Sequence, residues 1–321
     1  MSTISDLTPL DHLKASLRVE YSPLGAREKD LEKRLAGFVQ NSRDFFNGNA
    51  ASERFLFVPG ISGSGKTYTL QHLFKQVEAF QPWTDNHGRV IRPMISAPTP
   101  KQAGTKDLLI TVLEAMGLPS EGNERSLTKL VKEQIVAQKV KYIHLDEFQH
   151  AIRSGTPKQI DGVRDTLKNL VSIPSWPLHI ILSGVPLLDK IRVGDGQIER
   201  RSHVVAFRPL ECPADTKFIE SALVKIIVTQ CGLELDETLM KDDFADRLCR
   251  AKRGGWGSII ETVQNACFTA IENNRRKVTV KHFAYLYRMS TGCKPDDNIF
   301  TAPEAKYKKL KPQNALIDLE V

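Results

Sequence analysis

The sequence lacks the features that would place it in a membrane or outside the cell. No apolar run approaches the roughly 18 residues that a membrane span requires. The polar N-terminal stretch MSTISDLTPLDHLKASL has no basic region followed by an apolar one, so no secretory signal is predicted. The five cysteines are widely spaced and form no CxxC pair, which argues against disulfides and a zinc site. We therefore expect a cytoplasmic protein with no membrane partner.

Charge of one sign is only in modest excess. The formal net charge is +7 over 321 residues, which favours polyanionic partners but is also compatible with a solvated basic face. The chain is long enough for one large domain or two smaller ones, and no internal repeat is evident. Composition alone therefore leaves the function open.

Short, nearly continuous apolar runs alternate with helical patterns in the first two thirds of the chain. Such strands are typical of a parallel sheet that helices cover on both faces, so we expect an α/β fold with a parallel five-stranded sheet. Beyond residue 211 only amphipathic helical patterns follow. The expected strands are 55–58, 89–95, 141–145, 178–183 and 203–207, and the helices between them lie near 67–80, 105–116, 126–139 and 159–173.

These patterns divide the chain into four segments. Residues 1–45 are expected to form an N-terminal helical extension, and residues 46–210 an αβα core. Residues 211–290 are expected to form a separate helical domain. The last segment, 291–321, mixes proline, lysine and isolated apolar residues, which indicates a flexible tail that folds when it docks on a partner.

The stretch FLFVPGISGSGKTYTL (55–70) passes from an apolar strand through a glycine-rich turn into a helix. It matches GxxxxGK[ST], a loop in which backbone N–H groups surround a phosphate chain that side chains would obstruct. In this pattern the lysine reaches the β- and γ-phosphates, and the threonine hydroxyl binds Mg²⁺. The predicted nucleotide contacts are Gly60, Ile61, Ser62, Gly63, Ser64, Gly65, Lys66, Thr67 and Tyr68.

A second motif, YIHLDEFQH (142–150), ends an apolar strand in two carboxylates, Asp146 and Glu147. We expect Asp146 to order Mg²⁺ together with Thr67. Glu147 is then placed to polarise a water that faces the γ-phosphate. Phosphoryl transfer from ATP to water is therefore the expected reaction, with ATP and Mg²⁺ as cofactors.

The two motifs and the helical segment after them resemble the AAA+ superfamily, in which nucleotide lies between an αβα core and a helical lid. Within it, the chain is similar to the transposition regulators TniB and TnsC over most of residues 30–290. Beside the nucleotide motifs, the resemblance rests on PTPKQAGTKDLL (98–109), IILSGVPLL (180–188), QIERRSHVVAFRPL (197–210) and GGWGSIIETVQNA (254–266).

The resemblance implies roles for further residues. Ser183 takes the polar sensor-1 place beside the γ-phosphate. Arg200 or Arg201 supplies an arginine finger to a neighbouring copy, so that hydrolysis depends on assembly. Many AAA+ proteins have a sensor-2 arginine where this chain has Ser258, and Arg253 lies nearby.

The implied function is an ATP-dependent regulator of DNA transposition in the bacterial cytoplasm. Such a protein forms a homo-oligomeric ring or helical filament on double-stranded target DNA. It recruits or activates the transposase, contacts other transposition proteins such as a target-selection adaptor, and disassembles on hydrolysis. Basic side chains on loops that face the DNA make sequence-tolerant phosphate contacts. The candidates for these contacts are Lys101, Lys106, Arg153 and Lys158.

Three other functions remain open from the sequence. A replication-initiator or loader-type AAA+ ATPase would need a DNA-binding module beyond the lid. A small-molecule P-loop kinase would need a cap between strands. A nucleotide-gated DNA scaffold with little hydrolysis is compatible with Ser258. The residues His144, His150, His179 and Trp256 are interpreted as packed structural residues.

Overall fold

The computed structural model describes residues 8–19, 25–153 and 155–310. Among these residues, no helix is both long enough and apolar enough to cross a lipid bilayer.

The chain divides into two compact units. The described residues within 23–62 and 66–208 form one of them, which we call the sheet unit. The described residues within 1–22, 63–65 and 209–321 form the other, which we call the helical unit.

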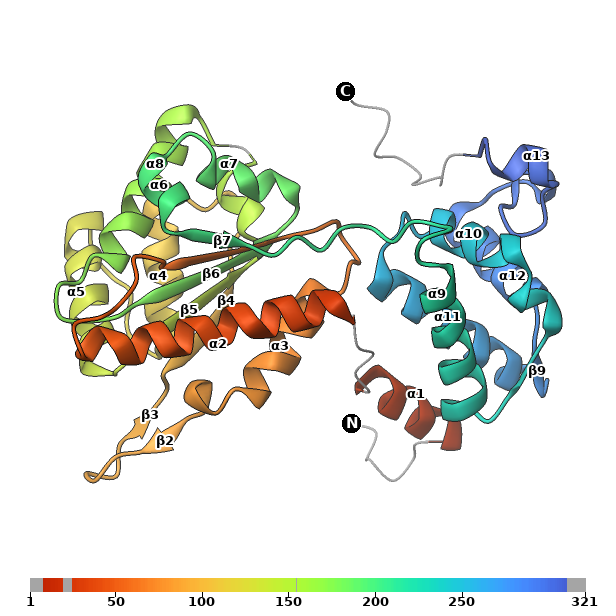
Figure 1. Cartoon of the computed structure of the whole chain (residues 1–321), viewed down its shortest axis with the longest axis horizontal. Helices are drawn as coiled ribbons and strands as arrows, with labels where there is room; N and C mark the ends of the chain where they lie inside the picture. The colour runs from red at the N-terminus through yellow and green to blue at the C-terminus, as the bar shows by residue number, and fades with distance from the viewer. Residues whose placement is uncertain (1–7, 20–24, 154, 311–321) are drawn as a thin grey trace. The chain divides into compact units, whose positions relative to one another are not determined.

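A parallel five-stranded sheet in the order β4–β5–β6–β1–β7 forms the centre of the sheet unit (Figure 1). Every residue of β6 is buried, as expected of a strand with helices on both faces. The strands are β1 (Phe55–Pro59), β2 (Trp83–Thr84), β3 (Val90–Ile91), β4 (Met94–Pro98), β5 (Tyr142–Asp146), β6 (His179–Gly184) and β7 (Ser202–Val204). The helices are α2 (Ala26–Phe46), α3 (Lys66–Gln76), α4 (Thr105–Ala115), α5 (Glu124–Ala137), α6 (Pro157–Val171), α7 (Asp189–Arg192) and α8 (Gly196–Arg200), with 3₁₀ turns η2 (Glu78–Phe80), η3 (Phe148–Ala151) and η4 (Pro186–Leu188).

Helices cover both faces of this sheet (Figure 1). On one face, Phe38 of α2 contacts the ring of His179 with the centroids 4.7 Å apart, and Phe74 of α3 contacts that of His144 at 5.1 Å. On the other face, apolar residues of α4, α5 and α6 share one core with the strands. The predicted α/β class and the five-stranded parallel sheet are therefore confirmed.

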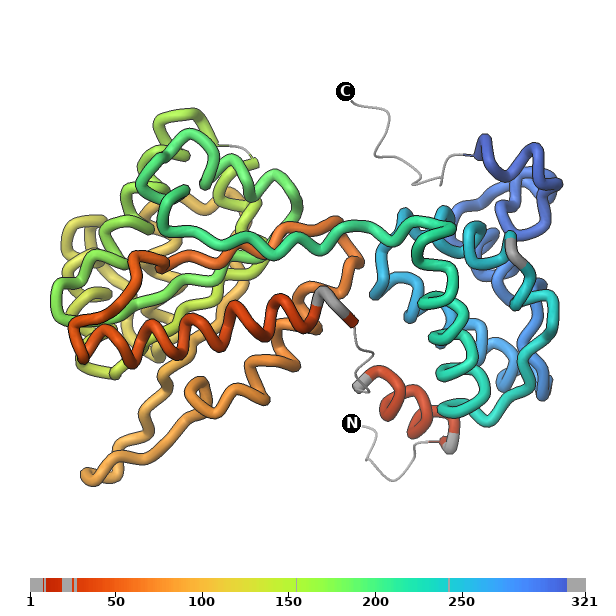
Figure 2. The backbone as a smooth tube through the Cα atoms, viewed as in Figure 1, coloured from red at the N-terminus to blue at the C-terminus, as the bar shows by residue number. Residues whose placement is uncertain are grey.

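The predicted strand at 89–95 is wrong in part. Pro93 has no N–H to donate to a ladder, and the chain divides there into β3 and β4. β3 pairs antiparallel with β2, and the Asp85 carboxylate closes the turn between them by accepting from the N–H groups of His87 and Arg89 at 2.9 Å each. Figure 2 follows this hairpin as an excursion of the chain away from the sheet.

The helical unit is built around an aromatic core. Phe244, Phe283 and Phe300 contact one another with ring centroids 5.0 to 5.8 Å apart, and buried Trp256 stacks on Phe218 at 4.3 Å. Contrary to the sequence prediction, strands do not end at residue 211, because β8 and β9 form a small parallel pair. The elements are α1 (Pro9–Val19), α9 (Thr216–Val224), η5 (Lys225–Gln230), β8 (Glu234–Leu235), η6 (Glu237–Met240), α10 (Asp242–Ala251), α11 (Trp256–Glu272), β9 (Lys277–Val278), α12 (Val280–Thr291), η7 (Pro295–Asp297) and α13 (Glu304–Tyr307).

The two N-terminal helices belong to different units, whereas the sequence suggested one extension over residues 1–45. α1 is part of the helical unit, where the side-chain amide of Gln264 on α11 donates to the Leu17 carbonyl at 3.0 Å. α2 belongs to the sheet unit and covers one face of its sheet. The single extension is therefore incorrect, because the two apolar helix faces have separate partners.

Much of the predicted flexible tail is packed. The sequence assigned residues 291–321 to a tail because its apolar side chains are isolated along the chain. In the structure, Ile299, Phe300 and Tyr307 are 0%, 4% and 1% exposed. They complete the core of the helical unit, so the tail prediction is wrong for this segment. Residues 311–321 lie outside the described part of the chain.

Arg247 of α10 holds residues 299–307 in place through hydrogen bonds and a ring contact. Its guanidinium donates to the carbonyl groups of Ile299 and Ala302 at 2.7 Å each and pairs with Asp243 at 2.8 Å. It also lies 3.9 Å from the ring centroid of Tyr307. One buried cation thus joins two turns of backbone to an aromatic ring.

Replacing Tyr307 tests this packing. Tyr307→Ala removes a buried ring and is expected to lower the unfolding free energy of the helical unit by about 3–5 kcal/mol. Tyr285→Ala is the matched control, since Tyr285 is 54% exposed and its removal should change stability by at most about 0.5 kcal/mol. Urea unfolding of both variants measures the difference; equal small effects would contradict the packed assignment.

Candidate nucleotide-binding site

The glycine-rich loop joins the carboxyl end of β1 to the first turn of α3. Gly63 and Gly65 have φ angles of +73° and +91°, in the left-handed region that glycine adopts without steric cost. Lys66 and Thr67 then open the helix, so the predicted strand, loop and helix follow one another as the motif requires. Tyr68 is 40% exposed.

Lys66 is a buried cation that is bonded to the loop itself. Its side chain is only 5% exposed, and Nζ donates to the carbonyl groups of Gly60 at 2.9 Å and Ile61 at 3.1 Å. Burial lowers the pKa of Lys66, while Glu147 and Asp146 act in the opposite direction. An ammonium held by neutral carbonyls in a desolvated place gains strongly from an anion.

Asp146, at the end of β5, is the centre of the polar contacts. Its Oδ2 accepts from the Thr67 hydroxyl at 2.7 Å, and its Oδ1 accepts from the Ser183 hydroxyl and from the Glu147 N–H at 2.9 Å. Burial opposes the charged form, but the hydrogen bonds from Ser183 and Thr67 outweigh it, so the pKa of Asp146 lies below its ordinary value. The structure thus brings three predicted site residues onto one carboxylate.

Glu147 stands in a strained conformation beside this carboxylate. Its φ of +51° lies in the left-handed region that disfavours a residue with a Cβ. The side-chain amide of Gln149 donates to Glu147 Oε2, and Gln149 Oε1 accepts from the Val185 N–H at 3.1 Å. A Cβ on Gly184 would meet Gln149 Oε1 at 2.3 Å, so a larger residue there would displace the Gln149 side chain. Gln149 therefore ties Glu147 to the end of β6.

His144 is linked to the same group. It is 1% exposed, and its ring nitrogens lie 2.8 Å from Ser183 Oγ and 2.8 Å from Ser96 Oγ. Burial lowers the pKa of His144 to about 4, so the imidazole is neutral at pH 7. The sequence interpretation treated His144 as a packed residue and did not include Ser96. The spacing of His144 and Asp146 (i, i+2 on a strand) is the signal that places both on one face.

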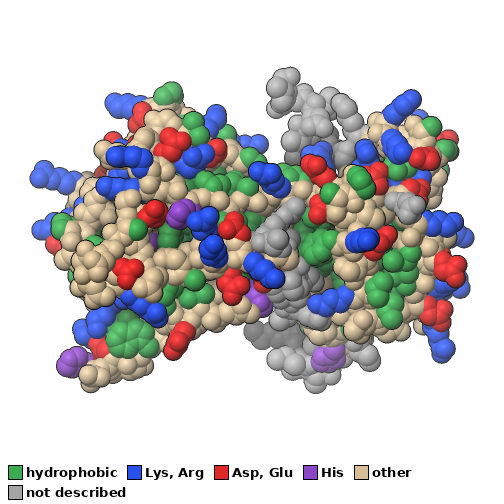
Figure 3. Space-filling view, viewed as in Figure 1, with side chains coloured by type: hydrophobic (Ala, Val, Ile, Leu, Met, Phe, Trp, Pro, Cys, Tyr) green, Lys and Arg blue, Asp and Glu red, His purple; other side chains and the backbone are tan. Residues whose placement is uncertain are grey.

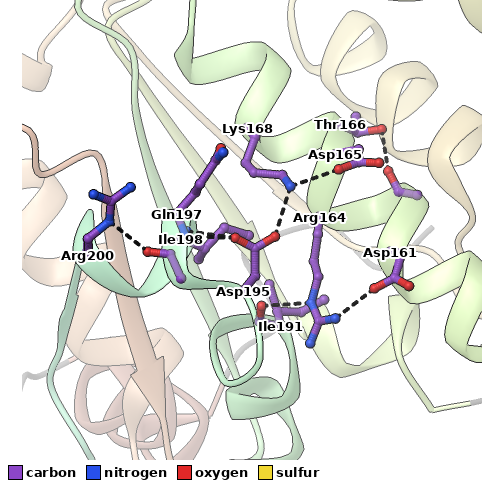
Figure 4. Close-up of polar contacts among 12 residues, drawn as sticks. Asp161, Arg164, Asp165, Thr166, Lys168, Ile191, Asp195, Gln197, Ile198 and Arg200 are labelled. Carbon is purple, nitrogen blue, oxygen red and sulfur yellow. Dashed lines mark hydrogen bonds and ion pairs between the residues drawn. The ribbon is translucent and has the colours of Figure 1, made fainter.

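The candidate finger residues do not contact this group in the described chain. Arg200 ends α8 and is exposed, with Nε donating to the Gly196 carbonyl at 3.1 Å. Arg201 follows it, and its carbonyl accepts from the N–H groups of Arg54 and Phe55 at 2.9 Å each. Figure 4 shows Arg200 beside an ion-paired segment that fixes α8. The predicted finger role of either arginine stays a prediction.

That segment is held by Asp195 at the start of α8. The Asp195 carboxylate accepts from the N–H groups of Gln197 and Ile198 at 3.0 and 3.1 Å, and Lys168 of α6 pairs with it at 2.9 Å. The position of Arg200 relative to the sheet is therefore set by a helix cap and an ion pair rather than by its own side chain.

The four predicted DNA contacts lie on loops and helix starts after β4 and β5. Lys101 is in the turn before α4 and Lys106 in its first turn, while Arg153 follows η3 and Lys158 begins α6. All four are exposed, and none of their side chains has an ion pair or hydrogen bond to another described residue. Ser154, next to Arg153, lies outside the described residues. Since β4 and β5 are parallel, the segments that carry these cations follow the same edge of the sheet at which Asp146 lies.

The described residues fit a nucleotide with Mg²⁺. The oxygens of Thr67 and Asp146, 2.7 Å apart, are the hard donors that Mg²⁺ prefers, and such sites use few protein ligands beside water and phosphate. Ser64 Oγ is buried and has no hydrogen-bond partner among the described residues. Together with buried Lys66, these groups match the chemistry of a phosphate chain and its metal ion.

The fold and this site define a P-loop NTPase. Residues 50–191 match the family model of an AAA domain. Cdc6p from Pyrobaculum aerophilum has a similar structure, with a TM-score of 0.57 at 11% identity over 90% of this chain and 74% of that chain. The Orc2 protein of Aeropyrum pernix, solved as ADPNP–ADP complexes, gives 0.53 at 17% identity over 83% and 69%. The search of curated proteins found no match. Because the sequence identities are this low, these similarities show the fold alone.

The backbone strain at Glu147 leads to a prediction about protein stability that can be tested without nucleotide. Glu147→Gly and Glu147→Ala both remove the carboxylate and its bond to Gln149, but only glycine relieves the left-handed φ. Glu147→Gly should therefore be more stable than Glu147→Ala by about 1 kcal/mol. Denaturant unfolding of the two variants checks this; an alanine variant as stable as the glycine variant would contradict the strain.

Proposed function

We propose that the chain is an ATP-hydrolysing AAA+ protein that assembles with further copies of itself on duplex DNA. Hydrolysis is supported by the contacts of the Asp146 carboxylate. It accepts hydrogen bonds from Thr67 of α3 and Ser183 of β6, and Glu147 is the next residue. The Orc2 structure was solved as ADPNP–ADP complexes, which supports ATP as the nucleotide.

The chain's own residues divide the work as follows. Lys66 would leave the loop carbonyls for the β- and γ-phosphates, where its charge would offset theirs. Thr67 and Asp146 would hold Mg²⁺, which when bound would neutralise phosphate charge. Glu147 orients the attacking water and accepts its proton. Ser183 would serve as the polar sensor of the γ-phosphate.

Two single substitutions test the site. Lys66→Ala removes the cation that offsets the phosphates and should abolish measurable ATP binding. Glu147→Gln keeps the shape and the bond to Gln149 but cannot accept a proton, so binding should persist while hydrolysis falls at least about 100-fold. Calorimetric ATP titration and a phosphate-release assay measure the two effects. Undiminished ATP affinity in Lys66→Ala would sink the assignment.

DNA binding is supported by charge and position. Four exposed cations without ion pairs lie on segments that follow the edge of the sheet where the candidate nucleotide site is, as described above. Figure 3 shows Lys and Arg interspersed with Asp and Glu over the visible face, so no broad one-sign field surrounds the molecule there. Contact with a polyanion would therefore depend on a few placed cations, and binding to phosphates should not depend on base sequence.

A paired substitution tests the DNA surface. Replacing Lys101 and Lys106 by alanine should weaken duplex binding equally for unrelated sequences and reduce the log–log salt slope by about one unit per lost phosphate contact. Replacing Lys75 and Lys129, exposed lysines of α3 and α5, removes the same charge elsewhere and should do neither. Fluorescence anisotropy at several salt concentrations gives both quantities. An effect confined to one sequence would indicate base readout instead.

Assembly is the second part of the proposal. The exposed position of Arg200 at the end of α8 leaves its guanidinium accessible to another copy, where it or Arg201 would act as the arginine finger. Hydrolysis would then rise with protein concentration and with DNA. Neither arginine serves Asp146 of its own chain in the described structure, which is what a finger in trans requires.

Two biological settings suit such an ATPase. The likeness of fold to Cdc6p and Orc2 supports a replication-initiator or loader type, although the match covers 74% of Cdc6p. The motif similarity to TniB and TnsC supports regulation of transposition, with recruitment or activation of a transposase. Electron microscopy on linear duplex with a non-hydrolysable ATP analogue separates them: filaments along arbitrary sequence favour the transposition regulator, and binding confined to one sequence favours the initiator.

A further inference from the structure

A chain of hydrogen bonds crosses the sheet from β4 to β6. Ser96 and His144 are direct partners in the β4–β5 register, and Ser96 Oγ lies 2.8 Å from His144 Nδ1. His144 Nε2 lies 2.8 Å from Ser183 Oγ, and the Ser183 hydroxyl donates to Asp146 Oδ1. His144 and Ser183 are 1% and 0% exposed, so water does not compete for the bond between them, whereas Ser96 is exposed at the outer end of the chain.

The proton positions in this chain follow from counting donors. Ser183 has one hydroxyl proton and gives it to Asp146, so Ser183 Oγ can only accept from His144. His144 Nε2 therefore carries the ring proton, and Nδ1 accepts from the Ser96 hydroxyl. All three bonds point toward the carboxylate, which makes each donor stronger through the one behind it.

We propose that His144 and Ser96 are positioning residues of the nucleotide site, which hold Ser183 and, through it, the Asp146 carboxylate in the orientation that binds Mg²⁺. The proposal rests on the proposed function. Without the His144 proton, the Ser183 hydroxyl has no second bond to fix its torsion. Asp146 Oδ1 then keeps only the Glu147 N–H as an oriented donor, and the carboxylate turns away from Thr67.

The ring of His144 also contacts the helix that carries the other half of the site. Phe74 of α3 packs edge-on against it at 5.1 Å, and the same helix begins with Lys66 and Thr67. His144 thus touches both elements whose side chains meet at Asp146: β6 through a hydrogen bond and α3 through a ring contact.

A second buried histidine shows what a purely structural role looks like. His179 of β6 is 0% exposed and contacts the rings of Phe38 and Tyr142 at 4.7 and 5.8 Å. In the described structure it has no hydrogen bond to Ser183 or Asp146. The sheet therefore accommodates a buried imidazole without a polar link, and the bonds of His144 are not explained by burial alone.

Two isosteric substitutions separate positioning from packing. In His144→Gln, the side-chain amide places an N–H near the Nε2 position, so the bond to Ser183 is kept. In His144→Asn, the shorter amide reaches only the Nδ1 position, so that bond is lost. His179→Asn is the matched control. ATP affinity is measured by calorimetry with Mg²⁺ and with EDTA, and folding by circular dichroism.

Mg²⁺ should raise the ATP affinity of His144→Asn about 10- to 100-fold less than it raises that of wild type, as for other residues that orient a metal ligand. The ATP affinity measured in EDTA should be the same in both proteins. His144→Gln should restore most of that gain, and His179→Asn should leave it intact. Equal Mg²⁺ gains in the Asn and Gln variants would overturn the proposal. A wild-type protein whose ATP affinity does not respond to Mg²⁺ would instead overturn the proposed function.

A measurement without nucleotide makes the proposal independent of variant folding. In the ¹⁵N-histidine-labelled full chain, His144 should show the Nε2–H tautomer, and Ser96→Ala should shift its Nδ1 resonance while leaving that of His179 in place. An Nδ1–H tautomer at His144 reverses the direction of the chain and excludes the proposed role.

Discussion

The arrangement of the site depends on one buried carboxylate. Asp146 receives hydrogen bonds from Thr67 of α3, from Ser183 of β6 and from the N–H of Glu147. These bonds outweigh the cost of burial and hold the pKa of Asp146 below its ordinary value. Because Thr67 and Ser183 are distant in sequence from Asp146, the carboxylate aligns the start of the glycine-loop helix with the carboxyl edge of the sheet. Loss of its charge would weaken all three hydrogen bonds, since bonds to a charged acceptor are the stronger ones.

Glu147, next to this carboxylate, has a strained backbone conformation at the candidate reactive site. Its backbone is left-handed, and Gln149, which packs against Gly184, donates a hydrogen bond to its carboxylate. Strained residues persist where surrounding contacts over-determine them, which is common at reactive sites. The ATPase chemistry proposed for Glu147 thus has a structural reason for a conformation that costs stability.

Much of the fold and part of the site could be predicted from local pattern. Continuous apolar strands predicted the parallel sheet, and the spacing of glycine and lysine placed Lys66 and Thr67 at the start of a helix. Tertiary contacts decided the rest. Ile299 and Tyr307 look isolated along the chain but meet Arg247 across the helical unit. Ser96 is unremarkable in sequence and gains meaning only from its register with His144.

The most direct test of the account is the Mg²⁺ dependence of ATP binding in Asp146→Asn, which keeps the size of the side chain but removes its charge. The account predicts that wild-type protein binds ATP more tightly with Mg²⁺ than with EDTA. It predicts that Asp146→Asn binds ATP in EDTA as wild type does but gains little from Mg²⁺. An Asp146→Asn protein with the full wild-type gain from Mg²⁺ would contradict the central role of this carboxylate.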